Sequence, residues 1–82
     1  MGTDKLADHV AKLLDMDISD VWSAGKYRPI VRARSLLCYW AVRELAMSMA
    51  FVARRLGISS TAVMQSVARG EKLVKENFYH FP

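Results

Sequence analysis

Apolar residues recur at helical spacing along most of this 82-residue chain. The first set falls at i, i+4, i+7 and i+8, which is one face of a helix, and consists of Leu6, Val10, Leu13 and Leu14. Thr3 precedes this set and is expected to cap the helix. Asp4 and Asp8 suit its positive end. The pattern predicts an amphipathic first helix that ends near Leu14.

Two further helices are predicted in the first half of the chain. Residues 17–22 form a short helix, with Ile18, Val21 and Trp22 turned to the core. Residues 23–29 are polar and basic, contain Gly25 and end in Pro29, which predicts a loop. Residues 30–45 contain no Gly or Pro, and their middle, residues 36–42, is apolar on every side. Since such a helix is normally surrounded by others, we expect it at the centre of the domain.

Residues 48–69 have the spacing of a helix-turn-helix. Val52, Ala53 and Leu56 form the buried side of a first helix capped by Ser48. Gly57 follows where the chain must reverse, and Ile58 fills the corner. Ser59 or Ser60 is expected to cap a second helix, whose buried side begins with Val63 and Val67. Two amphipathic helices joined by Gly also occur as a simple helical hairpin, so the pattern leaves that alternative open.

The last helix is expected to continue to Asn77, although Gly70 costs about 1 kcal/mol there and is a candidate for a bend. The chain is therefore predicted to be one all-α domain, residues 1–82, with about five helices around a central apolar helix. The expected core consists of Leu6, Val10, Leu14, Ile18, Val21, Leu37, Trp40, Ala41, Val52, Leu56, Ile58, Val63 and Val67.

Charge is distributed unevenly along the chain. Residues 1–22 contain two lysines and five aspartates, which gives a net charge of −3. Residues 23–75 contain ten Lys or Arg and two glutamates, which gives a net charge of +8. The basic part coincides with the helix-turn-helix and the loop that precedes the central helix. A phosphate backbone is the natural counterpart, because binding to it releases condensed cations. The alternative is a solvated basic face without a partner.

Several classes of function have little support. No stretch approaches the length of a membrane span, and the N-terminus has no signal-peptide pattern, so we expect a cytoplasmic, nucleoid-associated protein. Cys38 lies in an apolar segment and is expected to be a buried thiol. His9 and His80 lack evident partners for catalysis. The acidic residues Asp15, Asp17 and Asp20 are better interpreted as helix caps than as a cation site. We expect no enzyme activity, metal or cofactor, and no phosphate loop is present.

The order of these segments resembles the C-terminal DNA-binding domain of the bacterial replication initiator DnaA. The resemblance covers residues 9–74. It includes Ile18-Ser19-Asp20-Val21-Trp22-Ser23, the basic loop, Ile30-Val31-Arg32-Ala33-Arg34, Arg43-Glu44-Leu45 and the helix-turn-helix. Residues 33–45 also resemble the domain appended to single-tyrosine transposases of the insertion-sequence and repeat-associated type. The resemblance implies a Trp-repressor-like or initiator-like fold, and a possible upstream ATPase or catalytic domain in a longer parent protein.

The resemblance also implies a mode of docking, in which the second helix of the motif enters the major groove and an Arg at the start of the central helix enters the minor groove. Counting from the N-terminal side assigns the latter role to Arg34, whereas counting back from residues 43–45 keeps Arg32 in contention. The family's recognition helix opens with Gly-Gly-Arg-Asp-His-Thr-Thr-Val, and only Thr61 and Val63 match it here.

Base contacts are predicted for the exposed side of the second motif helix. Gln65 can make a bidentate contact to adenine, and the methyl group of Thr61 can meet a thymine methyl. Ser60 is a further candidate, and Met64 either contacts DNA or packs against the neighbouring helix. With Arg34, these residues form the predicted base-contacting set. Phosphate contacts are predicted for Lys26, Arg28, Arg32, Arg54, Arg55, Ser59, Arg69 and Lys72.

The function predicted from the sequence is sequence-specific binding of double-stranded DNA by a monomer, in replication initiation or in recognition of transposase targets or ends. The alternative is a protein-interaction or dimerisation module. Its docking surface would be formed by apolar residues expected to be exposed, namely Met47, Met49, Met64, Phe78, Tyr79 and Phe81.

Overall fold

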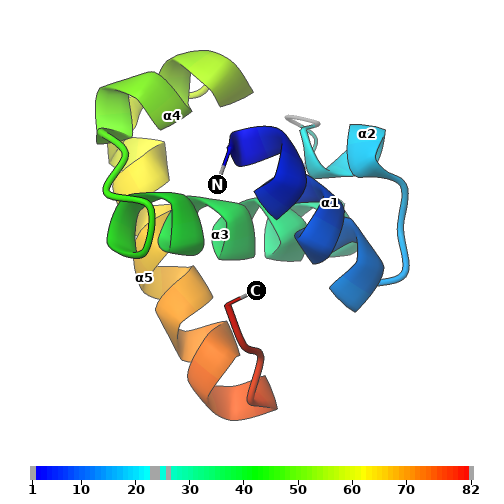
Figure 1. Ribbon diagram of the computed structural model, residues 1–82. Helices are drawn as coiled ribbons and strands as arrows, with labels where there is room; N and C mark the ends of the chain where they lie inside the picture. The colour runs from blue at the N-terminus through cyan, green and yellow to red at the C-terminus, as the bar shows by residue number, and fades with distance from the viewer. Residues whose placement is uncertain (1, 23–24, 26, 82) are drawn as a thin grey trace.

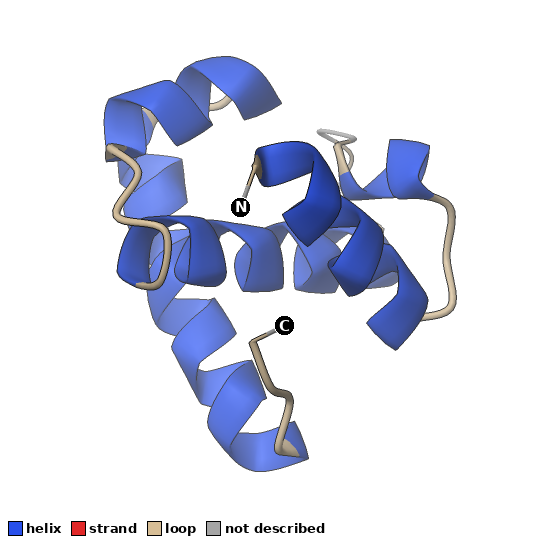
Figure 2. Ribbon diagram, viewed as in Figure 1, coloured by secondary structure: helices blue, strands red, loops and turns tan. Residues whose placement is uncertain are grey.

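The computed structural model describes residues 2–22, 25 and 27–81, and the described part is built from helices without a strand (Figure 2). The helices are α1 (Thr3–Leu13), α2 (Ile18–Val21), α3 (Arg28–Arg43), α4 (Met49–Leu56) and α5 (Ser60–Asn77). This confirms the predicted all-α class. In Figure 1, α3 crosses the middle of the molecule with α1 in front of it and α5 behind it.

The central position predicted for the apolar helix is confirmed. α3 packs against each of the other four helices, and Leu36, Leu37, Cys38, Trp40 and Ala41 are all buried. The helix begins at Arg28, not at Ile30 as predicted, because Pro29 stands in its first turn. Proline is tolerated there, since the first N–H groups of a helix have no intrahelical acceptor.

The first two helices differ from the prediction in detail. Gly2, not Thr3, is the N-cap residue of α1, and no side chain caps it. The face that α1 buries includes Ala7 and Ala11, whereas Leu13 is 36% exposed. Ile18 was expected in the core but is 42% exposed, so that assignment is wrong. α2 is a single turn in which Val21 alone is buried, which leaves its first residue in solvent.

Gly70 produces a close helix crossing and no interruption of α5. The helix continues through it to Asn77, as predicted, and Gly70 is buried. A Cβ at this position would overlap the carbonyl oxygen of Ser35 and would lie 2.6 Å from Cβ of Tyr39. The absence of a side chain therefore lets α5 lie directly on the backbone of α3.

After α5 the chain folds back towards α1 and α3, as the red end of the ribbon in Figure 1 shows. Phe78 ends the helix in the left-handed conformation, with φ 56°. The Phe81 ring then meets Trp40 edge-on, with centroids 6.3 Å apart. His9 Nε2 donates a hydrogen bond to the carbonyl of His80 over 3.1 Å. These contacts fix the C-terminal segment over the buried Trp40.

Candidate nucleic-acid interface

The pair α4 and α5 is joined by a short connection whose residues have the predicted local roles. The Ser48 hydroxyl accepts the N–H of Phe51 and caps α4. Gly57 ends that helix with φ 69°, a conformation that favours glycine. The Ser59 hydroxyl accepts the N–H of Ala62 over 3.1 Å, which identifies Ser59, not Ser60, as the cap of α5. These local interactions fix where α5 begins.

One side of α5 is continuously exposed, and we call it the α5 stripe. The opposite side, formed by Val63, Ser66, Val67 and Gly70, is buried. Residues 60–70 contain no acidic side chain. Met64, for which the sequence leaves open either a DNA contact or packing against the neighbouring helix, is 57% exposed. The α5 stripe consists of Ser60, Thr61, Met64, Gln65, Ala68, Arg69 and Lys72.

The C-terminal part of the stripe adjoins a groove between α3 and α5, the arginine groove. Arg28, Val31 and Arg32 line it from α3, and Arg69 and Leu73 line it from α5. Its volume is about 380 Å³. A neighbouring hollow shares Arg28 and Arg32 and adds Leu14 and Pro29. The lining of the arginine groove thus combines two aliphatic side chains with three arginines.

The three arginines of the groove make no ion pair within the described part of the chain. All three are exposed. Like charges gathered in one place repel each other, and an anion relieves that repulsion. The groove is thus suited to a phosphate or a carboxylate group.

Two arginines predicted to contact DNA are already engaged within the molecule. Arg34 Nη1 donates to the carbonyl of Gly25 over 3.2 Å, and its side chain is partly buried. Arg55 pairs with Asp4 over 2.9 Å, and its guanidinium lies 4.6 Å from the centroid of the Trp22 ring. Arg55 therefore ties α4 to α1 and to the residue that ends α2. Their predicted DNA contacts would require these interactions to be shared or broken.

The remaining basic candidates are spread over the surface. Arg54 is exposed and lines a shallow hollow with Phe51 and Arg55. Lys72 lies 3.9 Å from Glu76, one turn along α5. Lys26 lies outside the described residues.

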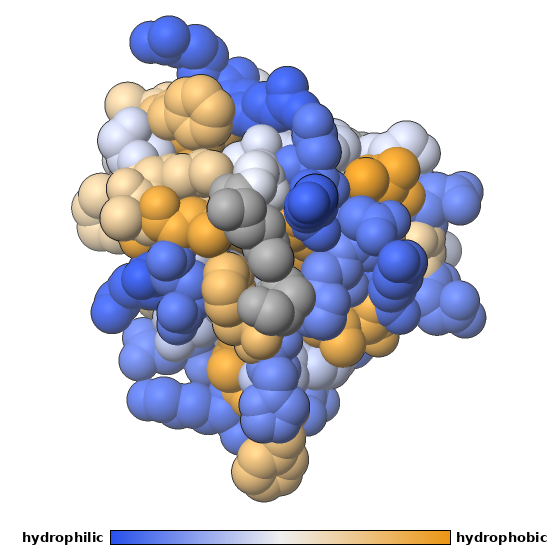
Figure 3. All heavy atoms as spheres, in the orientation of Figure 1, coloured by the Kyte–Doolittle hydropathy of each residue, from blue (hydrophilic) through white to orange (hydrophobic). Residues whose placement is uncertain are grey.

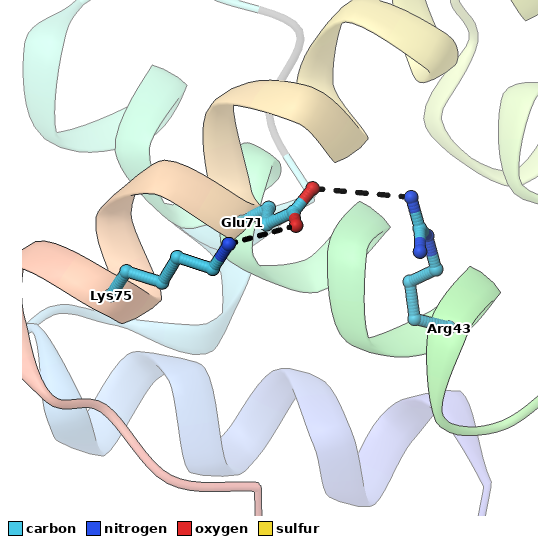
Figure 4. A network of polar contacts seen from close by, with 3 residues as sticks. All are labelled: Arg43, Glu71 and Lys75. Atoms are coloured by element: carbon cyan, nitrogen blue, oxygen red, sulfur yellow. Dashed lines mark ion pairs between the residues drawn. The ribbon is translucent and has the colours of Figure 1, made fainter.

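A polar network that the sequence did not suggest links α3 to α5. Glu71 Oε2 lies 3.9 Å from Arg43, and its other oxygen lies 3.3 Å from Lys75 (Figure 4). The i, i+4 spacing of Glu71 and Lys75 could have indicated their pair, but the partner from α3 depends on how the helices cross. The carboxylate of Glu71, the acidic residue of α5 closest in sequence to the α5 stripe, is thus paired with two basic side chains.

Apolar side chains form a second surface. In Figure 3 they gather at the left, over α4 and the connection that precedes it. Ala46, Met49, Ala50 and Phe51 are exposed there. Of the residues predicted for an interaction surface, Met47, Tyr79 and Phe81 instead pack partly buried against the core, whereas Met49, Met64 and Phe78 are exposed.

Cys38 is a buried thiol, as predicted. Burial raises the pKa of the Cys38 thiol to about 11, against smaller opposing effects of the Arg34 charge and a hydrogen bond with Ser66. At neutral pH this thiol is protonated and a poor nucleophile. Among the described residues, no group of three or more His, Cys, Asp or Glu side chains is placed to hold a metal ion. None of the described helices combines the length and apolarity needed to span a bilayer.

No protein-family model, no curated protein and no solved structure matches this chain. The resemblance to initiator and transposase-associated domains stays a prediction from the sequence.

Proposed function

We propose that this domain binds double-stranded DNA in a sequence-specific manner, with α5 in the major groove. Residues 48–69 act as a helix-turn-helix, and the domain docks as a monomer. The biological setting that we propose is replication initiation or recognition of transposase targets or ends, since the order of motifs along the chain resembles domains with those roles.

The observation that carries the proposal is the composition of the α5 stripe. Its first turns present uncharged groups that hydrogen-bond or meet methyl groups, namely Thr61, Met64 and Gln65. Its later turns present Arg69 and Lys72, next to the arginine groove. Uncharged polar and methyl groups recognise base edges, and basic groups bind phosphates. One helix face thus offers both kinds of contact in sequence.

A basic side chain beside the recognition helix is proposed to enter the minor groove. Arg32 suits this role better than Arg34, because Arg32 is exposed and forms no ion pair among the described residues, whereas the guanidinium of Arg34 bonds to Gly25. Arginine is favoured in narrow, A·T-rich minor grooves because their potential is strongly negative. We therefore assign the flanking contact to Arg32.

The proposal is tested by selecting a preferred site from random duplexes and comparing Gln65→Ala with Arg69→Ala on that site. Gln65→Ala should lose about 1 to 3 kcal/mol on the selected site and little on random DNA, because a base contact is lost. Arg69→Ala is the matched control on the same helix and should weaken binding to all duplexes alike. The measurement is a fluorescence-anisotropy titration of each variant.

Two outcomes of that experiment would contradict the proposal. If the wild-type domain selects no site, sequence-specific recognition is wrong. If Gln65→Ala keeps the wild-type preference, α5 does not contact the bases. The protein-interaction alternative has less support, because half of its predicted surface residues pack against the core.

A further inference from the structure

An acidic surface lies next to the arginine groove. Between α1 and α2 and within α2 the chain carries Asp15, Asp17 and Asp20, and we call residues 15–20 the acidic corner. None of these three carboxylates makes an ion pair within the described residues. Ile18, between them, is 42% exposed. The corner thus combines one exposed apolar side chain with three acidic residues that form no ion pair among the described residues.

The arginine groove has the complementary composition. Two of its lining residues, Val31 and Leu73, are aliphatic, and we call them its floor; its three arginines form no ion pair among the described residues. An aliphatic side chain fits the floor, while flanking carboxylates would form bidentate pairs with the arginines. Both charge and hydropathy of the two surfaces therefore match.

The acidic corner and the arginine groove are neighbours on the molecule, but no ion pair joins them among the described residues. Leu14 lines the hollow together with Arg28 and Arg32, and it directly precedes Asp15. No carboxylate of the corner nevertheless lies within ion-pair distance of these arginines. Two complementary surfaces that lie side by side can meet reciprocally when a second molecule is related by a two-fold axis.

We propose that the occupant of the arginine groove is the acidic corner of a second copy of this chain, in a two-fold dimer. Each corner places Ile18 over the Val31 and Leu73 floor of the other molecule, and its aspartates pair with the arginines there. The arrangement closes on itself, so it produces a dimer and no filament. Exposed ion pairs around a small apolar contact make the association weak and salt-sensitive.

The dimer uses arginines that are also proposed to contact phosphates, so DNA and the second copy would compete for them. The dimer itself does not depend on DNA binding, and it is tested in the absence of DNA.

The test is sedimentation velocity over a range of protein concentrations, with two oppositely reversed variants. One variant carries Asp17→Arg and Asp20→Arg, and the other carries Arg28→Glu and Arg32→Glu. Asp15 is left unchanged because its φ of 53° is unfavourable for most side chains. Circular dichroism confirms that each variant is folded, and Asp17→Lys with Asp20→Lys, which reverses the same charges, replaces the first pair if it is not.

At low salt the wild-type mass should rise with concentration from 9.3 kDa towards twice that value. It should return to the monomer mass near 0.5 M salt, where the Debye length is about 4 Å. Each reversed variant alone should remain a monomer, because its corner and groove carry the same sign. An equimolar mixture should associate again, since a basic corner then meets an acidic groove and the reverse.

A control variant, Lys5→Glu with Lys12→Glu, changes the net charge as much as the arginine variant but lies on α1, and it should behave as wild type. A wild-type protein that stays monomeric at low salt would overturn the proposal. So would a mixture of the two reversed variants that fails to associate while the wild type dimerises.

Discussion

Gly70 illustrates how one missing side chain sets the packing of two helices. In isolation it lowers the stability of α5 by about 1 kcal/mol relative to alanine. In the fold it is buried against the backbone of Ser35, whose hydroxyl donates a hydrogen bond to the carbonyl of Val31 over 2.8 Å. The close approach brings α5 onto α3 along much of both helices. We expect the packing gained to outweigh the local cost.

Gly70→Ala should therefore destabilise the domain by about 1 to 3 kcal/mol, because the added methyl group must push the helices apart. Gly2→Ala is the control, since a Cβ at Gly2 meets nothing within 4 Å. Its effect should be smaller, about 0.5 kcal/mol, which is the preference of an N-cap position for glycine over alanine. The measurement is chemical denaturation followed by circular dichroism. An unchanged or raised midpoint for Gly70→Ala would show that the crossing is not close in solution.

The arginines show what residue-level analysis of a sequence can and cannot predict. Their concentration in the later part of the chain follows directly from counting. Counting does not show which arginines form ion pairs within the molecule, because the partner of Arg55 is Asp4, which lies 51 residues away in the sequence. Arg34 and Arg32 differ by two positions, yet one bonds to a loop carbonyl and the other lines a groove. Such differences arise from the tertiary arrangement.

At the scale of elements, the helices with local signals were predicted best. Ser48, Gly57 and Ser59 determine the ends of α4 and the start of α5 through interactions within a few residues, so the sequence contains them. The start of α3 was predicted two residues late, because Pro29 is compatible both with a loop and with a first helical turn. The exposed Ile18 was missed since apolar spacing in a one-turn helix does not define a face.

Ser59→Ala should cost about 1 kcal/mol of stability, because the N–H of Ala62 loses its acceptor at the start of α5. Ser60→Ala is the matched control. Ser60 is the first residue of the helix and is exposed, so its replacement should be nearly neutral. Thermal denaturation of both variants measures the difference. Equal midpoints for the two would mean that the Ser59 cap does not stabilise the helix.

At the scale of the whole molecule, the two helices that pack on opposite sides of α3 differ in the charge around them. α1 and α5 both pack on α3, and no close approach between α1 and α5 is found among the described residues (Figure 1). α1 carries Asp4 and Asp8 against Lys5 and Lys12, so its net charge is zero, and Lys12 pairs with Asp8 over 3.0 Å. Arg28, Arg32 and Arg69, which form no ion pair within the part of the chain that the structure describes, line the groove between α3 and α5. An approaching polyanion should therefore be attracted to the side of α5.

The salt dependence of DNA binding tests this difference. Each phosphate contact contributes about 0.9 to the slope of log K against log salt concentration, because it releases condensed cations. Arg28→Gln with Arg69→Gln should thus reduce the magnitude of that slope by nearly 2. Lys5→Gln with Lys12→Gln removes the same charge from α1 and should leave the slope unchanged. Anisotropy titrations at several salt concentrations give both values. Equal reductions for the two double variants would show that DNA senses only the net charge of the domain and has no preferred side.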